Sequence, residues 1–539
     1  MSATASKPRW RAALGNGAML ALLLVAALAL LPWHDDPWWP ASPRPRQWWL
    51  AAGTLALYLA ACGALLPRRR QRTATDTGEP LPWLVAHASQ TGFATELAAH
   101  TAASLRAAGC EVALHPLSAV DATMLARTRR ALFIASTTGE GDPPDPALPF
   151  LRDTMAHEPA LTQLQYAVLA LGDRDYAHFC GFGRHLDQWL RGCGASALFD
   201  LTEVDNADPG ALRHWQHHLA QAAGAASMPD WTPPRYERWT LAGRRLLNPG
   251  SQGGPAFHLL LQPPPGATPT WQPGDIAEIG PRNPRAAVDA LLSASGLDGE
   301  ARVLFGSQTM LLREALARAR LPDANGLPGD AQATADALQP LPHREYSIAS
   351  LPADGALELL VRQMRHDDGR PGLGSGWLCL HAGIGEIIDL RIRANPGFHP
   401  PEGDGPLLLV GNGTGIAGLR ALLKARAAAG ARRNWLLLGE RQRAHDAFFG
   451  EDIERWQREG VLEHCDLAWS RDSAPRYVQD ALRAHAPRLR AWIDEGASVY
   501  VCGSLAGMAP GVDAVLREAL GGEAVDALRD GGRYRRDVY

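Results

Sequence analysis

Three short loops between residues 81 and 224 carry residue types that bind phosphate groups and flat rings. A hydroxyl-rich turn at residues 89–92 precedes a helical pattern, so backbone N–H groups and the positive end of the helix are free to face a phosphate. Glycines at residues 136–141 let the backbone approach a planar ring, and residues 172–179 place two aromatic side chains on a third loop. Each loop alone is ordinary turn chemistry, but together they predict a site for a phosphorylated aromatic ligand. The candidate contacts are Ser89, Gln90, Thr91, Gly92, Ser136, Thr137, Thr138, Gly139, Gly172, Asp173, Tyr176 and Phe179.

A second set of candidate residues lies between residues 340 and 380. In the strand-like run at residues 344–350, alternation puts Arg344 and Tyr346 on one face, which suits a pyrophosphate and a flat ring. A surface strand is the alternative reading. Downstream, Gly372 and Ser375 open a helix and form a second helix start suited to an anion.

A glycine-rich turn follows the apolar strand at residues 406–410 and leads into a helix. Its glycines include Gly413 and Gly415, with Thr414 between them, and this context of strand, turn and helix is typical of a dinucleotide loop. No acidic residue stands where the ribose of NAD would need one. Ser470 and Arg471 follow a later strand and suit the 2′-phosphate of NADP.

These loops must be held by three successive folded regions. In residues 81–224, apolar runs alternate with helical patterns, which predicts a doubly wound parallel sheet that binds its ligand at the carboxyl ends of the strands. Residues 225–235 form a proline-punctuated linker, and short strands with many turns predict a β-barrel-like domain at residues 236–403. Residues 404–539 return to an α/β pattern.

In the order of these motifs the sequence resembles the diflavin reductases, the group that contains the NADPH-cytochrome reductases and the flavoprotein component of assimilatory sulfite reductase. The resemblance implies a flavodoxin-like FMN domain, a ferredoxin-NADP reductase-like FAD domain and an NADP-binding domain. It also implies that residues 89–92 hold the FMN phosphate and that Tyr176 stacks on the isoalloxazine ring. Two features depart from the family: Thr138 replaces a common tyrosine, and only about 60 residues separate Asn283 from Arg344, where a longer helical connecting segment is usual.

The same resemblance assigns roles near the second flavin. Arg344 and Ser375 would contact the FAD pyrophosphate, Tyr346 would pack on the ring, and Ser347 would lie near flavin N5. Further roles come from the last third of the chain. Arg476 and Tyr477 would join the 2′-phosphate residues, Cys502 would lie beside the nicotinamide, Asp537 would lie near the hydride path, and Tyr539 would cover the flavin. The ending Asp-Val-Tyr is similar to that of the sulfite reductase flavoprotein.

Residues 1–72 are predicted to form a transmembrane helical hairpin with spans at about 12–33 and 47–67, followed by a polar tether at 73–80. Both stretches are uncharged, and each is long enough to cross a bilayer core. Basic residues cluster before the first span and after the second, which predicts an inner-membrane protein with its flavin domains in the cytoplasm.

Composition narrows the class of protein further. The 539 residues include 53 Lys and Arg against 57 Asp and Glu, so a formal charge of -4 makes nucleic-acid binding a poor expectation. Seven scattered cysteines form no C-x-x-C pair, so no metal site is predicted.

The sequence therefore predicts an anchored enzyme that passes electrons from NADPH to FAD, then to FMN, and finally to a one-electron acceptor such as a haemoprotein. The sulfite reductase flavoprotein and a ferric-chelate reductase are alternatives within the same class; against the former, its partner needs no membrane hairpin. The alternative from another class is a membrane-tethered sensor or scaffold that has lost turnover.

Overall fold

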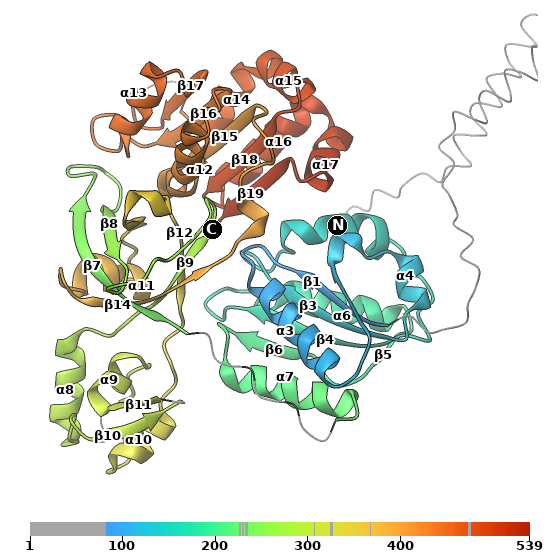
Figure 1. Cartoon of the computed structure of the whole chain (residues 1–539), viewed down its shortest axis with the longest axis vertical. Coiled ribbons are helices and arrows are strands. Elements are labelled where there is room, and N and C mark those ends of the chain that lie inside the picture. The colour runs from blue at the N-terminus through green and yellow to red at the C-terminus, as the bar shows by residue number, and fades with distance from the viewer. Residues whose placement is uncertain are drawn as a thin grey trace, which may run out of the picture. The chain divides into compact units, whose positions relative to one another are not determined.

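The described residues belong to one compact unit of the chain. The computed structural model describes residues 82–539 apart from 226, 227, 229, 230, 232–234, 307, 324–326, 367 and 473–475. The described part of the chain contains three sheets of five or six strands and one two-stranded sheet (Figure 1).

The first sheet is parallel, and its strand order β2-β1-β3-β4-β5 is the doubly wound order of flavodoxin-like folds. Side chains of β1 alternate between two cores. Leu84 packs with α4 to α6 on one face, and Val85 packs with α3 and α7 on the other. The strands are β1 (Trp83–Ala88), β2 (Val112–Pro116), β3 (Arg130–Ser136), β4 (Gln165–Gly172), β5 (Ser196–Ala197) and β6 (Thr202–Asp205). The helices are α3 (Phe93–Ala107), α4 (Ala122–Arg127), α5 (Leu148–Phe150), α6 (Gly181–Gly192) and α7 (Pro209–Ala222), with the short turns η2 (Leu117–Ala119), η3 (Asp145–Ala147) and η4 (Leu151–Met155).

The carboxyl-terminal part of this sheet contains two short strands, β5 and β6, which both pair with β4. Between them the chain leaves the sheet, and the half-buried Phe199 packs edge-on against the buried Trp215 at a centroid distance of 5.3 Å. The packing of this ring therefore coincides with the break between the two strands.

The second sheet is antiparallel, with the order β12-β9-β14-β7-β8-β13, as the short-strand pattern predicts. A core around Trp239, Leu259 and Trp377 lies within it. Its strands are β7 (Glu237–Leu246), β8 (Ala256–Gln262), β9 (Ile276–Gly280), β12 (Arg344–Ser347), β13 (Leu357–Arg362) and β14 (Ile387–Arg393). Its helical turns are η6 (Pro352–Asp354), α11 (Leu373–Gly376), η7 (Trp377–His381) and η8 (Pro396–Phe398).

The short connecting segment between β9 and β12 folds around a core of its own. Leu292, Val303 and Leu316 are central to that core. Its elements are α8 (Arg285–Ser295), the hairpin of β10 (Arg302–Phe305) and β11 (Gln308–Leu311), α9 (Leu312–Ala317) and α10 (Ala331–Ala337). The segment thus contains a hairpin as well as helices.

The third sheet is parallel with the order β17-β16-β15-β18-β19, which matches the first five positions of the dinucleotide-binding order 3-2-1-4-5-6. The chain reverses direction across the sheet between β15 and β18, so the edge at their carboxyl ends is the expected ligand site. The strands are β15 (Leu407–Asn412), β16 (Asn434–Glu440), β17 (His464–Trp469), β18 (Ser498–Gly503) and β19 (Tyr534–Val538). The helical elements are η9 (Gly413–Gly415), α12 (Ile416–Ala428), α13 (Gly450–Arg458), α14 (Val478–Ala484), α15 (Ala486–Asp494), α16 (Met508–Leu520) and α17 (Gly522–Asp530).

The predicted localisation is contradicted. No helix among the described residues is long and apolar enough to cross a membrane. The two predicted spans, at about 12–33 and 47–67, lie outside the described residues. The prediction of an inner-membrane protein is therefore withdrawn, and with it the argument that a hairpin disfavours the sulfite reductase flavoprotein.

Candidate functional site

The first candidate loop caps helix α3. Ser89 Oγ accepts hydrogen bonds from the backbone N–H groups of Gly92 at 2.9 Å and Ala94 at 3.2 Å. Gly92 has a φ of 92° and lies against the carbonyl of Ala394, so a side chain at this position would be strained and would collide with that carbonyl. The loop is therefore fixed both by its own helix and by the end of β14.

The second and third loops pack against each other at the same edge of the sheet. A Cβ on Gly141 would lie 2.6 Å from His178 Cβ, and Glu140 Oε2 accepts from the backbone N–H of Ala177 at 3.0 Å. Thr138 Oγ1 donates to the carbonyls of its own turn, whereas the hydroxyl oxygen of Thr137 is buried without a hydrogen-bond partner among the described residues. A buried hydroxyl without a partner at a ligand-binding edge fits a polar ligand such as the predicted FMN.

The two predicted aromatic contacts of the third loop are placed differently. Tyr176 is 49% exposed on the loop and is available to a ring, while Phe179 packs against the core below the Arg174 guanidinium, 4.6 Å from the ring centroid. Asp173 closes the turn by accepting from the backbone N–H of Asp175 at 2.9 Å. Gly172 is required by close packing, since a Cβ there would lie 2.8 Å from the backbone nitrogen of Cys180. Of the two rings, only Tyr176 is free to stack on a ligand.

The candidate FAD residues converge as the sequence predicts. Arg344 and Tyr346 project from the same side of β12, and a Cβ on Gly374 would collide with the Tyr346 hydroxyl and lie 2.9 Å from Arg344 Cβ. Only glycine fits at that position, so the turn that begins at Gly372 lies directly on the strand. Ser375 Oγ accepts from the backbone N–H of Met364 at 3.0 Å and ties the turn to the segment after β13. This glycine-lined cradle beside an arginine fits a pyrophosphate attached to a flat ring.

A buried polar cluster joins the second and third sheets. Ser347 Oγ donates to Asp537 Oδ2 at 2.8 Å, and Cys502 Sγ lies 3.7 Å from the same oxygen. Cys502 and Asp537 are register partners on the parallel strands β18 and β19. A Cβ on Gly418 would lie 3.4 Å from Cys502 Sγ, so the dinucleotide helix also reaches this cluster.

Protonation in this cluster follows from burial. Burial raises the pKa of Cys502 well above its ordinary value, and the neighbouring Asp537 carboxylate raises it further, so the thiol stays neutral and acts as a hydrogen-bond donor. Burial also raises the pKa of Asp537, against the opposing effect of the Ser347 and Cys502 hydrogen bonds. The cluster therefore holds one carboxyl group that accepts hydrogen bonds from two neutral donors.

The C-terminal residue, Tyr539, is held by hydrogen bonds of both its backbone N–H and its carbonyl. The backbone N–H of Tyr539 donates to the carbonyl of Gly503, its carbonyl accepts from the N–H of Leu505, and both distances are 3.0 Å. Its hydroxyl donates to Thr414 Oγ1 of the dinucleotide loop at 3.2 Å, and the residue is 58% exposed. Tyr539 is thus an anchored aromatic residue at the open side of the cluster.

The dinucleotide loop and the predicted phosphate residues lie along the carboxyl edge of the third sheet. A Cβ on Gly415 would collide with the carbonyl of Cys502, so glycine is needed where β15 and β18 meet. Ser470 follows β17, and its N–H donates to the carbonyl of Glu440, which ends the neighbouring β16, at 2.8 Å. Arg471, Arg476 and Tyr477 are exposed at this edge. A helix start flanked by exposed cationic groups fits a phosphorylated dinucleotide.

Sequence reasoning missed the residues that hold the first domain against the others. Gln90 Nε2 donates to the carbonyl of Arg536 at 2.7 Å, while its Oε1 accepts from the N–H of Asp145 at 2.9 Å. Arg536 forms a bidentate ion pair with Asp145, and Arg393 donates to the carbonyl of Thr91. Their partners lie hundreds of residues away in sequence, so no local pattern could have identified them.

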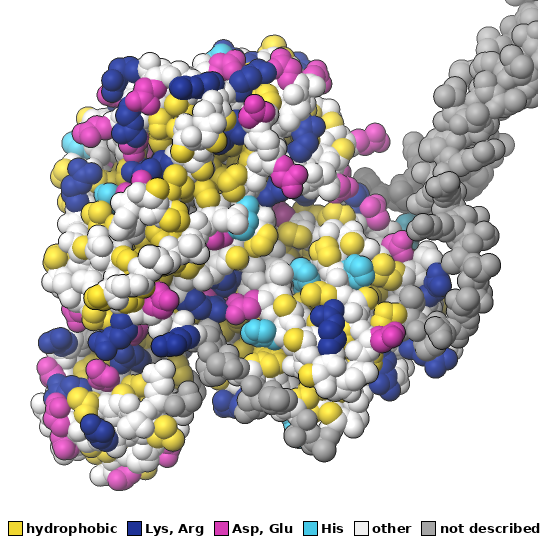
Figure 2. Space-filling model, viewed as in Figure 1, with side chains coloured by type: hydrophobic (Ala, Val, Ile, Leu, Met, Phe, Trp, Pro, Cys, Tyr) yellow, Lys and Arg dark blue, Asp and Glu magenta, His cyan; other side chains and the backbone are white. Residues whose placement is uncertain are grey.

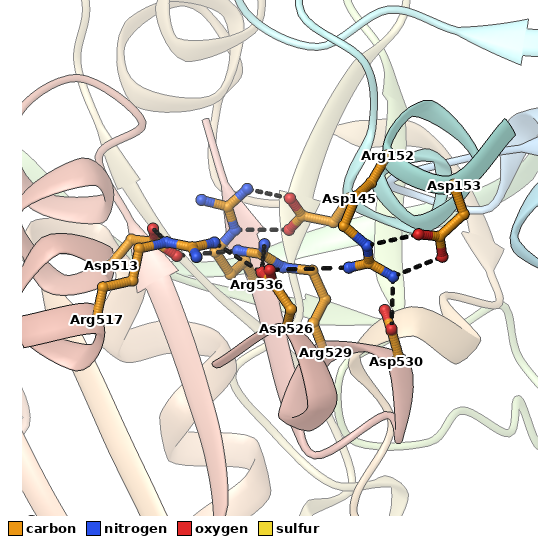
Figure 3. Close-up of polar contacts among 9 residues, drawn as sticks. All are labelled: Asp145, Arg152, Asp153, Asp513, Arg517, Asp526, Arg529, Asp530 and Arg536. Carbon is orange, nitrogen blue, oxygen red and sulfur yellow. Dashed lines mark hydrogen bonds and ion pairs between the residues drawn. The ribbon is translucent and has the colours of Figure 1, made fainter. Parts of the chain in front are cut away.

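A further ion-pair network, drawn in Figure 3, lies beside this contact. Arg152 Nη2 lies 2.8 Å from Asp530 Oδ2, and Arg152 Nη1 lies 3.9 Å from Asp526 Oδ2. Arg517 and Arg529 connect Asp526 to Asp513 on α16. We call Arg152, Asp526 and Asp530 the interdomain ion cluster, because Arg152 belongs to η4 and both aspartates belong to α17.

Comparisons with known proteins identify two domain families and several relatives of the chain. A flavodoxin family model matches residues 85–215, and an oxidoreductase NAD-binding domain model matches residues 409–514. The chain is 30% identical to the sulfite reductase (NADPH) flavoprotein alpha-component of Neisseria meningitidis serogroup C (strain 053442), over 92% of this chain and 95% of that protein. It is 31% identical to the proteins of the same description from Yersinia enterocolitica and Cronobacter sakazakii, over 84% of this chain and 89% of each relative.

These matches confirm the predicted class of enzyme and its cofactors. The protein is an NADPH-dependent flavoprotein oxidoreductase that uses FMN, FAD and NADPH. With a flavodoxin-like domain, an NAD-binding domain and relatives aligned over nearly their whole length, the chain belongs to the diflavin reductase family.

Proposed function

We propose that this protein transfers electrons from NADPH to a haemoprotein, and that the haemoprotein component of an assimilatory sulfite reductase is the first acceptor to test. The relatives named sulfite reductase (NADPH) flavoprotein alpha-component support this acceptor. The observation that carries the proposed reaction is the cluster of Ser347, Cys502 and Asp537 beside the dinucleotide loop. When bound, the flavins supply the chemistry, since they accept a hydride and release electrons one at a time.

NADPH would bind along the carboxyl edge of the third sheet. Gly413, Thr414 and Gly415 would face the pyrophosphate with backbone N–H groups at the start of the helical segment that continues into α12. Ser470 and Arg471 would bind the 2′-phosphate, with Arg476 and Tyr477 at its rim. The side chains of Arg471, Arg476 and Tyr477 are exposed, which supports this role because a phosphate must reach them from solvent.

The nicotinamide would reach the cluster between β12 and β18. There Ser347 would position the reacting edge of the flavin ring, and Asp537 would orient the Ser347 hydroxyl through the 2.8 Å hydrogen bond. Cys502, as a neutral thiol, would limit the depth at which the nicotinamide lies. Tyr539 would cover the face of the flavin ring until the nicotinamide takes its place. The hydrogen bond from the Tyr539 hydroxyl to Thr414 supports this role, because it ties the tyrosine ring to the dinucleotide loop.

The flavin-binding residues would act mainly by holding the two flavins in place. Arg344 and Ser375 would contact the FAD pyrophosphate, and Tyr346 would pack on the ring. In the first domain, backbone groups of residues 89–92 would hold the FMN phosphate, and Tyr176 would stack on the ring. Residues 136–139 would lie along the ring edge, where the unpartnered hydroxyl of Thr137 would find its hydrogen bond.

A ferric chelate is the rival acceptor, and it would require no protein docking surface. The alternative of a sensor without turnover does not agree with the enzyme class that the relatives share. Figure 2 shows acidic and basic side chains interspersed on the face it presents, so this face does not single out a partner by the sign of its charge.

A parallel assay distinguishes the acceptors. The purified protein should be yellow, with about one FMN and one FAD per chain, and its oxidation of NADPH is measured with three acceptors: sulfite reductase haemoprotein, a cytochrome and a ferric chelate. The proposal expects the highest specificity constant with sulfite reductase haemoprotein. A higher specificity constant with the ferric chelate would reject the haemoprotein acceptor.

A further inference from the structure

Two histidines face each other on the solvent side of helix α7. His214 and His218 stand four positions apart, so they lie on the same face of the helix, one turn from each other. Their Nε2 atoms are 3.0 Å apart, and His214 is exposed while His218 is half-buried. Neither residue is among the flavin or coenzyme contacts, so the proposed function makes no use of this pair.

Packing fixes one of the two rings. The His218 imidazole stacks on Phe199, with ring centroids 4.8 Å apart and ring planes 15° from parallel. Phe199 packs in turn against the buried Trp215, so a chain of aromatic contacts connects His218 with the core of the first domain. The exposed His214 ring can turn about its side-chain bonds, which allows the lone pairs of both Nε2 atoms to point at one ion.

A single hydrogen joins the pair, and a metal ion can replace it. One ring donates an Nε2–H and the other ring accepts it with a lone pair. Burial lowers the pKa of His218, and the charges that His214 and His217 can carry lower it further, while Gln221 and Asp200 act in the opposite direction. His218 therefore stays neutral at pH 7. A neutral imidazole that carries its proton on Nδ1 offers its Nε2 lone pair to a metal ion.

The spacing of the two nitrogens indicates which ions fit. Ligand nitrogens lie about 2.0 to 2.1 Å from a bound ion, so two nitrogens 3.0 Å apart subtend an angle of about 90° to 100° at that ion. This is the angle between neighbouring ligands of tetragonal Cu²⁺ or Ni²⁺, and it is narrower than the tetrahedral angle that Zn²⁺ favours. The charge of Asp200 acts on the His218 ring, and a negative charge at this place favours a bound cation.

We propose that His214 and His218 form a two-nitrogen site for a divalent transition-metal ion on the first domain, with Cu²⁺ as the most tightly bound ion. Both the tetragonal angle and the general order of affinities for nitrogen ligands favour Cu²⁺. Among the residues that the structure describes, no group of three or more His, Cys, Asp or Glu side chains is arranged to hold a metal. Water would therefore fill the remaining positions of the ion. The site does not depend on which acceptor takes electrons from the flavins.

Equilibrium titration of the oxidised, flavin-loaded protein tests this site with three probes: Cu²⁺, Ni²⁺ and Zn²⁺ salts. His214→Gln and His218→Gln should each raise the dissociation constant of Cu²⁺ by at least about tenfold, since loss of a group that only orients a metal ligand already costs ten- to a hundredfold. His217→Gln is the matched control and should leave this constant unchanged. His217 is exposed on the same helix, but its Nε2 pairs with the side chain of Gln221 at 2.9 Å. Ions held by other side chains bind equally in all four proteins, so the differences report the pair.

Two further measurements identify the ligands as imidazoles. The electron paramagnetic resonance spectrum of one equivalent of Cu²⁺ should show coupling to two nitrogens in the natural protein and should lose it in His214→Gln and His218→Gln. The affinity for Cu²⁺ should fall from pH 7.5 to pH 5.5, because protons compete with the metal for the imidazole nitrogens. His217 and Asp200 are the other titratable groups that act on the pair, and His217→Gln should keep the pH profile of the natural protein.

Three outcomes would overturn this assignment. If His214→Gln and His218→Gln both bind Cu²⁺ as the natural protein does, the ion is held elsewhere and the site does not exist. If His217→Gln loses as much affinity as these two variants, the two-nitrogen ligand set is wrong. If Zn²⁺ binds more tightly than Cu²⁺, the tetragonal geometry is rejected. Flavin content and the circular dichroism of each variant show whether the first domain and α7 are folded.

Discussion

The hydroxyl of Ser347 donates to the Asp537 carboxylate at 2.8 Å, although the two residues stand 190 positions apart in the chain. Ser347 ends β12 of the antiparallel sheet, and Asp537 lies on β19, the last strand of the chain. The hydrogen bond therefore connects the proposed flavin-bearing strand with the proposed nicotinamide-binding sheet.

The first prediction concerns this bond. Asp537→Asn should lower the rate of flavin reduction by NADPH about ten- to a hundredfold, because a hydrogen bond to a charged group contributes roughly 1.5 to 3 kcal/mol. Ser347→Ala should cost about as much, and the double variant should lose little more, since both substitutions remove one interaction. Stopped-flow bleaching of the flavin measures these rates, with flavin content as the control for folding. Additive losses would show that the two residues act separately.

Coenzyme preference should depend on Arg471. Because this exposed guanidinium would meet only the 2′-phosphate, Arg471→Ala should raise the Michaelis constant for NADPH by about ten- to a hundredfold and leave NADH turnover nearly unchanged. Steady-state kinetics with both nucleotides decide the matter. Equal losses with the two nucleotides would assign Arg471 a structural role.

Deletion of Tyr539 should also shift coenzyme preference towards NADH, but for a different reason. An aromatic stack contributes roughly 0.5 to 1.5 kcal/mol beyond buried area, so a nicotinamide that displaces the ring pays a comparable cost. NADPH offsets this cost through its 2′-phosphate, whereas NADH does not, so the truncated protein should gain proportionately more with NADH. An unchanged ratio of the two specificity constants would mean that Tyr539 does not gate the flavin.

The interdomain ion cluster should affect docking of the first domain. Arg152→Gln removes its pairs with Asp526 and Asp530, each worth at most about 1 kcal/mol at this exposure, and should increase hydrogen exchange of the amides in η4 and α17. Arg313→Gln is a matched control: Arg313 is 42% exposed against 40% for Arg152, and its two acidic partners, Asp289 and Glu300, both lie within the connecting segment. If the amides of η4 and α17 exchange equally in both variants, the interdomain ion cluster does not contribute to docking of the first domain.

Stability in acid should depend on Glu358. Burial raises the pKa of this carboxyl, but the hydrogen bond from His258 and the charge of Arg420 outweigh burial and lower it to about 2. A pKa lowered by folding stabilises the native state above the unfolded value near 4.5, and this stability is lost as the pH falls towards 2. Thermal unfolding should therefore show that Glu358→Gln loses up to about 3 kcal/mol at pH 6 and much less near pH 2.5.

The exposed Glu300 supplies the comparison for that measurement. Its side chain is 63% exposed and pairs with Arg313, so Glu300→Gln should change stability little at any pH. A constant difference between Glu358→Gln and the natural protein from pH 6 to pH 2.5 would contradict the assigned ion pair.

The sequence by itself determined the local parts of this protein. Short apolar runs predicted the strands that precede Ser89 and Gly413, and alternation predicted the strand that carries Arg344. The order of these motifs along the chain carries the family resemblance, which implied the class of enzyme. Such features depend on neighbouring residues, through side-chain periodicity and the backbone freedom of glycine, so they are visible without the fold. The predicted membrane localisation used the same kind of pattern and was contradicted.

The tertiary structure alone decided which distant groups meet. Phe179 has the residue type of a ring contact, but the packing of its loop turns it towards the core and leaves Tyr176 exposed. Arg362 reaches Glu440 because the end of β13 lies beside the dinucleotide loop, and no spacing in the sequence encodes that contact. Partners joined through space are selected by the packing of whole sheets, so a pattern read along one segment cannot identify them.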